Sequence, residues 1–374
     1  MLERHPRTLP PLLGALGWIL ILAASSGRAD DCAPIVDPDP RACAGTHSLS
    51  ISKRYLLAVH AAAPGSTFAE HETYLLESDD GQGWGVVPGW EAYVGSVPEV
   101  TERDGLLYLF NPGKQRVYDL AGGSVSGASV SISDPSGDPV SYVDPSAILD
   151  DQNRIVLFFL NSTGVPPGTD PASGTDPKDF DSATEDPGSG ALAFTLEAGP
   201  RVEALSSDPD IFFDGSQYLL YISFGANTRA YRADTLHGSY EAFPGLGSEA
   251  LLTTAGGVPA GHYDALNTEY WTYVHANVGG VNVVRRAVHD GFDAALLVSD
   301  FTTVVAAADL GLGATTSVES PSLFDRGPSV STPLPGLGPP GVWLLAALMS
   351  AASLAHLRQR RQSIAGNLKA RRLP

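Results

Sequence analysis

Short hydrophobic runs, each followed by a polar turn and a second run rich in Tyr and Phe, recur along the chain and predict β-strands. Four copies of this module carry a proline near their start, at positions 98, 145, 209 and 259. Asp104-Gly105 and Asp214-Gly215 suit tight hairpin turns, because glycine tolerates the positive φ that such turns need. A weaker first copy runs from His47 to Val59. β-Branched and aromatic residues fill the runs, so an all-β fold is expected.

Five such units of nearly 50 residues predict a five-bladed β-propeller over residues 46–326. A β-sandwich of similar strand count is the rival, but it would not predict a proline at the same point of each unit. The proline is expected to open the strand nearest the propeller axis, where a missing N–H costs least. The longer gap between positions 145 and 209 predicts an inserted surface loop at residues 162–190, which are crowded with Pro, Gly, Asp and Thr.

The N-terminal 29 residues predict a signal peptide. Arg4 and Arg7 precede an apolar run from Leu12 to Ala24, which is too short to span a membrane comfortably, and cleavage is expected after Ala29. Residues 30–45 then form an N-terminal segment that contains the only two cysteines, Cys32 and Cys43. Because an exported chain meets an oxidising compartment, a disulfide between them is expected. A metal site or catalytic thiol is the alternative, without a Cys-x-x-Cys spacing to support it.

The C-terminal residues predict attachment to a membrane. Residues 327–340 are a linker rich in Pro, Gly and Ser, residues 341–357 are apolar enough for a transmembrane or sorting helix, and residues 358–374 are basic. The basic tail should stay cytoplasmic, which puts the acidic domain outside, in the periplasm or at the cell surface. This order resembles the PEP-CTERM type of sorting signal, which implies a sorting protease as a partner. Thr332-Pro333-Leu334-Pro335 lacks the usual Glu, and a plain single-span anchor is the alternative.

Charge separates the predicted outer domain from the tail. Residues 30–326 contain 41 acidic and 14 basic side chains, a net charge of −27, although the whole chain carries only −19. Such a surface repels phosphate backbones, so nucleic acid is excluded as a partner. It is compatible with neutral sugars and with cations, and it also keeps an exposed protein soluble.

Three phrases resemble glycoside hydrolase family 43 and its relatives, which are five-bladed propellers that cleave furanosides, arabinans, xylosides or fructans. Asp144-Pro145-Ser146 followed by Ile148-Leu149-Asp150-Asp151 is similar to the family's second-blade motif. Gly261-His262 with Tyr273-Val274-His275-Ala276 is similar to its Gly-His and Tyr-His-Ala pattern. Ser78-Asp79-Asp80-Gly81 with Trp84 looks like an outer-strand phrase of such propellers. The resemblance implies that the partner is a carbohydrate, most simply a polysaccharide.

Hydrolysis in that family needs three carboxylates in the channel mouth: a base, a proton donor and a residue that orients the donor. Asp144 matches the orienting carboxylate. The base is normally the Asp of an Asp-Pro pair, but this chain has Val97-Pro98 with Glu99 next; the donor is normally the Glu of a Glu-Gly-Pro phrase, but here the phrase is Ser207-Asp208-Pro209-Asp210. The candidate catalytic residues are therefore Glu99, Asp144, Asp208 and Asp210. The alternative is that an Asp before Pro only caps the turn through its side chain.

Other side chains complete the candidate site. Trp84, Trp90 and Tyr263 could offer faces for sugars to stack on. The resemblance implies that His262 faces the channel and supports a bound calcium or water, and the alternative is a hydrogen-bonded core histidine. No cofactor other than this calcium is expected.

Two functions remain open from the sequence. The first is an exported, membrane-tethered propeller that engages carbohydrate at the cell surface as a furanosidase-like glycoside hydrolase. The second is a non-catalytic propeller for carbohydrate binding, surface display or adhesion. A structural propeller with calcium in its channel is a third, weaker hypothesis.

Overall fold

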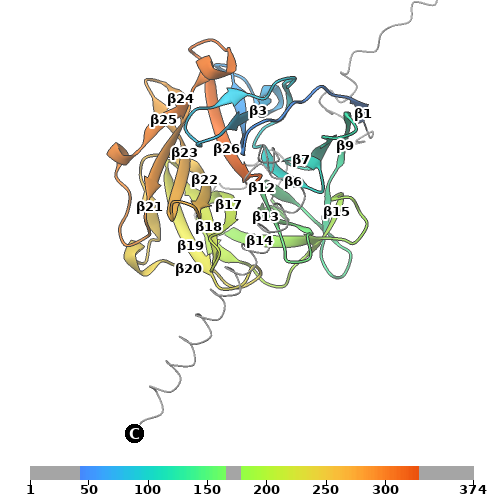
Figure 1. Ribbon diagram of the computed structural model, residues 1–374. Helices are drawn as coiled ribbons and strands as arrows, with labels where there is room; N and C mark the ends of the chain where they lie inside the picture. The colour runs from blue at the N-terminus through green and yellow to red at the C-terminus, as the bar shows by residue number, and fades with distance from the viewer. Residues whose placement is uncertain (1–42, 166–177, 328–374) are drawn as a thin grey trace, which may run out of the picture.

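The structure, a computed structural model, describes residues 43–165 and 178–327, which form five β-sheets (Figure 1). The strand pairs are antiparallel except for β10 with β15. The only helical turns in the described ranges are short 3-10 segments: η2 (Phe68–Glu70), η3 (Pro244–Leu246), η4 (Val298–Asp300) and η5 (Ala307–Leu310). The all-β prediction is confirmed for this part of the chain.

Each sheet is one blade, with its strands in order from the inner edge outward. Blade 1 is β26 (Ser317–Asp325), β2 (Tyr55–Ala62) and β3 (Glu72–Ser78), with β4 (Gly85–Val86) and β5 (Tyr93–Val94) both on β3. Blade 2 is β6 (Glu99–Arg103), β7 (Leu106–Asn111), β8 (Lys114–Asp119), β9 (Ser124–Ser129) and β1 (Cys43–Thr46). Blade 3 is β12 (Tyr142–Leu149), β13 (Ile155–Asn161), β14 (Lys178–Glu185), β15 (Ala193–Leu196), β10 (Ser131–Ser133) and β11 (Pro139–Val140), with β16 (Val202–Ala204) also on β14.

Blade 4 is β17 (Ser207–Phe213), β18 (Tyr218–Phe224) and β19 (Asn227–Ala233), with β20 (Glu241–Ala242) and β21 (Leu251–Thr253) both on β19. Blade 5 is β22 (Gly257–Asp264), β23 (Glu269–Val278), β24 (Val281–His289) and β25 (Thr302–Val305). The inner strands contact one another in the closed order β6, β12, β17, β22, β26 and back to β6. Five sheets around one axis make a five-bladed β-propeller, as the repeat predicts.

Blade 1 is built from both ends of the described chain. The last strand, β26, pairs with the second, β2, from Tyr55 opposite Asp325 to Ala62 opposite Ser317. Figure 1 shows the blue β3 and the orange β26 close together in this blade, although they are far apart in the sequence. The weak first copy of the repeat thus supplies the second strand of its blade, and the inner strand comes from the C-terminal side. Such pairing covers the edge of β2 that would otherwise be free and closes the ring of blades.

The fifth proline of the repeat is therefore Pro321, which the spacing of the other four does not reveal. The residue before each of the five prolines has a positive φ between 45° and 53°: Val97, Asp144, Asp208, Val258 and Ser320. In β12, β17, β22 and β26 the pairing register shifts at this point, whereas in blade 2 the Val97-Pro98 pair directly precedes β6. A bulge leaves a residue unpaired, so proline is tolerated there.

Side chains link the inner strands where they face the axis. At four of the five junctions between blades, the side chain of the residue that follows the proline accepts a hydrogen bond. The donor is a backbone N–H of the next blade, on the residue two positions after that blade's proline. The links run from Glu99 Oε1 to Ala147 N at 2.8 Å, Ser146 Oγ to Ile211 N at 3.1 Å, Asp210 Oδ2 to Gly261 N at 2.7 Å and Ser322 Oγ to Val100 N at 3.0 Å. An inner strand has no neighbour toward the axis, so its N–H groups need such partners. Ala260 occupies the fifth position and has no side-chain acceptor.

The prediction of a surface loop at residues 162–190 is wrong for part of that range. Residues 178–185 form β14, which pairs with β13, β15 and β16 inside blade 3. Polar residues outnumber apolar ones along this strand, and several of them find partners in the fold. Asp181 accepts a hydrogen bond from Asn161, and Glu185 forms an ion pair with Arg103 of blade 2. From the sequence alone such a polar strand is predicted to be a loop, because the partners of its polar side chains come from distant segments.

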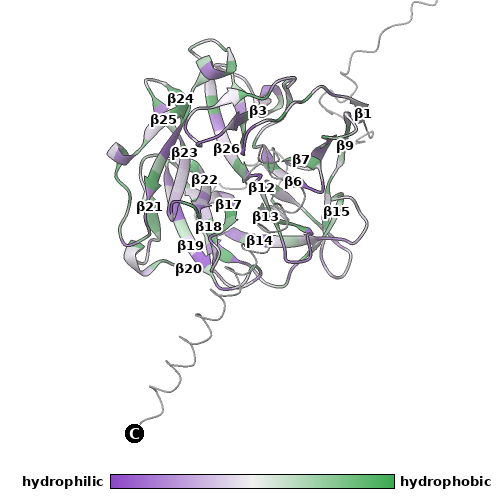
Figure 2. Ribbon diagram, viewed as in Figure 1, coloured by the Kyte–Doolittle hydropathy of each residue, from purple (hydrophilic) through white to green (hydrophobic). Residues whose placement is uncertain are grey.

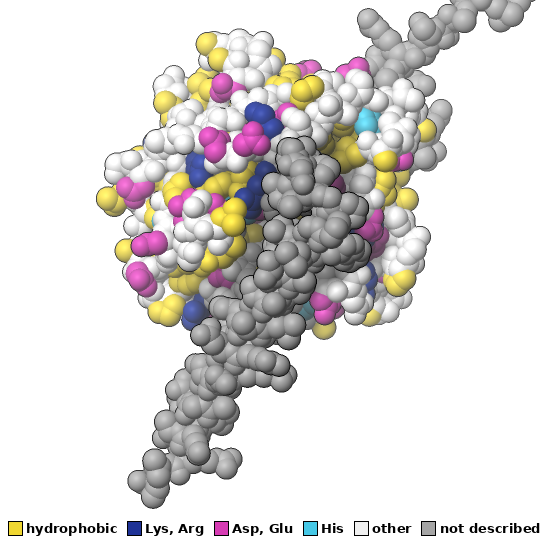
Figure 3. Space-filling model, in the orientation of Figure 1, with side chains coloured by type: hydrophobic (Ala, Val, Ile, Leu, Met, Phe, Trp, Pro, Cys, Tyr) yellow, Lys and Arg dark blue, Asp and Glu magenta, His cyan; other side chains and the backbone are white. Residues whose placement is uncertain are grey.

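The hydrophobic core lies between the blades. The second strand of each blade carries a continuous buried run, such as Leu56–Val59, because both of its faces are covered by neighbouring blades. The other runs are at positions 107–110, 155–160, 219–222 and 271–274. Figure 2 shows hydrophobic residues along strands of every blade, and Figure 3 shows acidic side chains spread over the visible face.

Both predicted chain ends lie outside the described residues. The predicted signal peptide, the apolar segment at 341–357 and the basic tail all lie outside the described residues. Cys32 also lies outside them, so the Cys32–Cys43 bridge stays a prediction. Among residues 43–165 and 178–327, no helix combines the length and apolar character that crossing a membrane requires.

Candidate functional site

A small cavity lies on the propeller axis, where the five prolines meet. Its volume is about 20 Å³, which holds one water. The proline-containing segments at or beside all five inner strands line it: Val97, Pro98, Glu99, Asp144, Pro145, Asp208, Pro209, Asp210, Val258, Pro259, Ser320, Pro321 and Ser322. The structure thus brings all four candidate carboxylates to one place, although they are far apart in the sequence.

The four carboxylates occupy two kinds of position. Asp144 and Asp208 directly precede their prolines, on the adjacent strands β12 and β17, and both are half-buried. Ser207 Oγ donates a hydrogen bond of 2.5 Å to Asp208 Oδ2. Glu99 and Asp210 directly follow their prolines, are only 5% and 6% exposed, and take part in the ring of links between blades.

Burial shifts the two inner carboxyl groups toward their protonated forms. The pKa of Glu99 lies well above its usual range, because the group is desolvated and because the charge of Asp210 lies nearby. Burial also raises the pKa of Asp210 to about 7, against the opposing effect of the Gly261 N–H. Near neutral pH this pair therefore retains a proton, which is the condition that a general acid must meet.

The positive φ of Asp144 and Asp208 is not by itself a sign of catalysis. Val97 and Val258 adopt the same conformation, with φ of 46° and 45°, although β-branched residues disfavour it strongly. The conformation therefore belongs to the bulge that the propeller repeats in each blade. Asp tolerates this conformation better than Val does.

Glu319 is a fifth carboxylate near the cavity, and it is absent from the candidates that the sequence motifs supply. The phrase Glu319-Ser320-Pro321 places a Glu two residues before the repeated proline, which is where the family's Glu-Gly-Pro phrase has its donor. Recognition of Pro321 as the fifth repeat would have found it. Asn282 Nδ2 donates to its Oε1 at 2.8 Å, and His60 Nε2 lies 3.5 Å from its Oε2. The His60 contact lowers the pKa of Glu319 to about 2, so at neutral pH it is a carboxylate and not a proton donor.

Three histidines lie near Glu319: His60 of β2, His71 directly before β3 and His275 of β23. His60 Nδ1 accepts a hydrogen bond from Val97 N at 3.2 Å, and its ring stacks on His71 at 4.5 Å between centroids. Burial lowers the pKa of His71 and of His275, so both are neutral at pH 7. The hydrogen bond from Val97 to His60 thus connects this group of histidines to the wall of the cavity.

His262 does not lie at the cavity. Its Nε2 is 3.7 Å from Asp325 Oδ2, and its ring packs between Tyr55 and Trp271 at 5.4 Å and 4.9 Å. Burial lowers its pKa to about 4, so the ring is neutral. Within the described ranges, no three His, Cys, Asp or Glu side chains stand close enough to hold a metal ion together, and the calcium stays a prediction.

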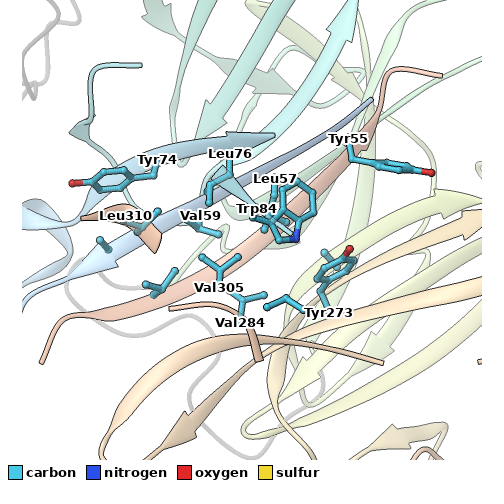
Figure 4. Close-up of a cluster of buried hydrophobic side chains, with 14 of the residues drawn as sticks. Tyr55, Leu57, Val59, Tyr74, Leu76, Trp84, Tyr273, Val284, Val305 and Leu310 are labelled. Atoms are coloured by element: carbon cyan, nitrogen blue, oxygen red, sulfur yellow. The ribbon is translucent and has the colours of Figure 1, made fainter. Parts of the chain in front are cut away.

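None of the three aromatic candidates lines the cavity. Trp84 is 9% exposed and packs among core side chains that include Leu57 and Tyr273 (Figure 4), so its faces are covered and it is a core residue. Trp90 donates from Nε1 to Thr73 O and packs against the Tyr93 and Tyr118 rings. Tyr263 is half-buried against Tyr270, at 4.9 Å between ring centroids.

Comparisons with known proteins give structural likeness only. No family model matches the sequence, and no curated protein matches it. Among solved structures, a GH43_1 enzyme from Xanthomonas citri complexed with xylotriose is 16% identical, with a TM-score of 0.43 over 68% of this chain and 89% of that one. The inulosucrase from Halalkalicoccus jeotgali is 16% identical, with a TM-score of 0.41 over 78% and 88%. The catalytic domain of a GH62 α-L-arabinofuranosidase from Coprinopsis cinerea is 12% identical, with a TM-score of 0.41 over 57% and 71%.

Proposed function

We propose that this propeller engages a polysaccharide at the mouth of its channel and hydrolyses a glycosidic bond there. The observation that carries the proposal is the meeting of Asp144, Asp208 and Asp210 around a cavity that holds one water. Asp144 and Asp208 are half-buried, and burial raises the pKa of Asp210 to about 7. A carboxylate that activates water and a carboxyl group that keeps a proton are the two parts that inverting hydrolysis requires.

The proposed step assigns one role to each group. Asp208 removes a proton from the water, whose oxygen attacks the anomeric carbon while the bond from this carbon to the leaving oxygen breaks. Asp210 gives its proton to the leaving oxygen, directly or through a water molecule for which the cavity has room, and Asp144 orients the sugar. Glu319 stays ionised beside His60 and stabilises positive charge that develops on the sugar ring.

The location of this activity is part of the same proposal. Residues 1–29 direct the chain out of the cytoplasm, and residues 341–357 hold it in the cell envelope as an anchor or serve as a sorting segment. The acidic surface suits a neutral glycan and disfavours nucleic acid. Membrane fractionation of cells that produce the full chain, with and without residues 341–374, tests this part by itself.

Hydrolysis is tested on the full-length chain with aryl arabinofuranosides, aryl xylosides, arabinan and xylan. Asp208→Asn and Asp144→Asn are expected to lower kcat/KM by at least about a hundredfold, since each removes a group that acts in the transition state. Asp134→Asn is the matched control, because Asp134 also precedes a proline but caps an exposed turn through Ser136 N and Asp138 N. Turnover that is absent in the wild type, or equal in Asp208→Asn and Asp134→Asn, contradicts the proposal.

A non-catalytic carbohydrate-binding propeller is the second candidate. The hydrogen bonds between inner strands favour this function, since Glu99 and Asp210 each use one carboxyl oxygen to bind a backbone N–H of the neighbouring blade. In this case the buried carboxyl groups stabilise the fold, and the channel mouth binds carbohydrate without cleaving it. Glycan-array binding by the full chain, combined with no release of reducing sugar, would select this function over hydrolysis.

A further inference from the structure

Two stacked histidines hold the segment that forms one wall of the axial cavity. Residues 95–97, the wall segment, lead into β6, and Val97 lines the cavity. The rings of His60 and His71 stack at 4.5 Å between centroids, with 15° between their planes, and the two residues are only 2% and 6% exposed. Val97 N donates to His60 Nδ1 at 3.2 Å, and Ser96 Oγ lies 3.1 Å from His71 Nδ1. Two successive residues of the wall segment are thus held by the two rings of the stack.

The bond to His60 holds Val97 in a strained conformation. The φ of Val97 is 46°, which a β-branched residue strongly disfavours, and strain of this kind persists only where the surroundings maintain it. Gly95 is fixed independently, because its N–H donates to His71 O at 2.8 Å and its carbonyl accepts from Thr73 Oγ1 at 3.0 Å. Loss of the bond to His60 therefore frees Val97 first, at the edge of the cavity.

The bond from Val97 also fixes where the proton of His60 lies. Because Nδ1 accepts from the Val97 N–H, the neutral ring carries its proton on Nε2, which lies 3.5 Å from Glu319 Oε2. A second proton can attach only at Nδ1, where it would face the N–H of Val97. Two buried donors that face each other both lack an acceptor, which is costly. The charged form of His60 is therefore incompatible with the bond that holds Val97.

Three other titratable side chains lie near the histidine pair: Glu319 of β26, His275 of β23 and Glu70 of η2. Residues 95–98, on the side of the cavity, contain no charged group. Burial lowers the pKa of His71 and of His275, which opposes charge on both rings. Glu319 attracts positive charge on His60, since the two side chains are 3.5 Å apart. Two charged rings at 4.5 Å would repel each other, so the stack accepts one proton, and His60 is the ring placed to take it.

We propose that His60 and His71 form a pH-sensitive latch on the channel mouth, which holds Val97 while His60 is neutral and releases it when His60 takes a second proton. Histidine is the side chain whose charge ordinarily changes between about pH 5 and pH 8. The wall segment is thus fixed at neutral pH and loosened in acid. Both histidines are positioning residues, because they act on the mouth only through residues 95–97. Any effect of the latch on hydrolysis rests on the proposed function, whereas the movement of the wall segment does not.

The experiment is amide hydrogen exchange of the full-length chain at pH 8 and pH 5, read by mass spectrometry, with each rate divided by that of the unfolded chain at the same pH. Protection of the amides in residues 95–99 is expected to fall by about tenfold or more in the wild type at pH 5, since a hydrogen bond is lost.

Variants of His60 separate the latch from other titrations. In His60→Asn the side-chain Oδ1 can take the place of Nδ1 as acceptor and binds no proton, so protection should be retained at pH 5. His60→Phe keeps a stacked ring without an acceptor, so protection should be low at both pH values. His47→Asn is the matched control, because His47 Nδ1 also accepts a backbone N–H, that of Leu49 at 3.1 Å, but on blade 2 beside Asp119. This control should behave as the wild type.

The outcomes separate the latch from the proposed hydrolysis, because exchange needs no substrate. Protection that falls in the wild type and is retained in His60→Asn supports the latch. Protection of residues 95–99 that is equal at both pH values overturns it, as does an equal fall in the wild type and His60→Asn, or a fall that the buried strand β18 shares through global unfolding. A latch without turnover of any glycan contradicts the proposed function alone. Turnover without a pH-dependent change in exchange contradicts the latch alone.

Discussion

Asp210 of β17 accepts a hydrogen bond of 2.7 Å from the backbone N–H of Gly261 in β22, and thereby joins two blades at the propeller axis. The same relationship recurs at three other junctions with Glu99, Ser146 and Ser322 as acceptors. Position, and not residue type, is what these acceptors share, because each directly follows the repeated proline. The carboxylates of the candidate site are thus also parts of the structure that closes the ring.

Removal of one neutral link should destabilise the propeller. Ser322→Ala leaves the buried N–H of Val100 without its partner, and an unsatisfied buried donor costs about 1–3 kcal/mol of unfolding free energy. Ser66→Ala, in which an exposed hydroxyl loses a bond to Ala63 O, is the control and should change stability by less than about 0.5 kcal/mol. Urea unfolding of both variants measures the difference. Equal midpoints for the two would show that the link between blades contributes nothing.

The Glu99 and Asp210 pair should contribute less to stability as the pH rises from about 4 to about 7. In the unfolded chain Glu99 and Asp210 lose their protons near pH 4, whereas burial in the folded chain raises both pKa values, that of Asp210 to about 7. The folded state therefore binds more protons in this window, and a group of this kind favours folding less as the pH increases. Chemical unfolding at several pH values measures the slope. Buried histidines such as His262, whose pKa is about 4, act in the opposite direction in this window, so the wild type is compared with Asp210→Asn and Glu99→Gln. The stability of each variant relative to the wild type should increase with pH, and a difference that does not change with pH would contradict the assignment.

Gly261→Ala should be strongly destabilising. A Cβ atom at Gly261 would overlap the ring of Phe212 in the neighbouring blade, beside the link from Asp210. Overpacking at such a site costs about 1–3 kcal/mol or more. Gly313→Ala is the matched control, because a Cβ atom there meets no atom within 4 Å and the residue does not have a positive φ. Thermal unfolding should separate the two variants by several degrees, and similar melting temperatures would mean that blades 4 and 5 are not packed as described.

Val258→Asn should stabilise the protein. Val258 has a φ of 45° before Pro259, and this conformation strains a β-branched residue but suits Asn. Relief of the strain is worth about 1 kcal/mol. The half-exposed Val288 on β24 has no such strain, so Val288→Asn serves as the control and should be neutral or slightly destabilising. A fall in the urea midpoint of Val258→Asn relative to the wild type would show that side-chain packing at the axis outweighs the backbone strain.

Much of the candidate site follows from the sequence, because its residues are tied to a visible repeat. Glu99, Asp144, Asp208 and Asp210 each lie next to a repeated proline, so their convergence follows once the repeat is arranged around an axis. Glu319 does not emerge from the repeat, because its blade draws its inner strand from the other end of the domain. The sequence predicts that Trp84 stacks on a sugar and that His262 faces the channel. In the structure, residues from distant strands pack Trp84 into the hydrophobic core and place His262 beside Asp325.

The sequence by itself determined the all-β class, the hairpins and the five-fold repeat, since turns, strand runs and prolines act over a few neighbouring residues. Only the tertiary structure decided that residues 317–325 complete the first blade, that the polar residues 178–185 form a strand within blade 3, and that Glu99 and Asp210 keep a proton. The physical reason is that burial, the partner of an edge strand and the pKa of a carboxyl group all depend on atoms contributed by residues far away in the chain.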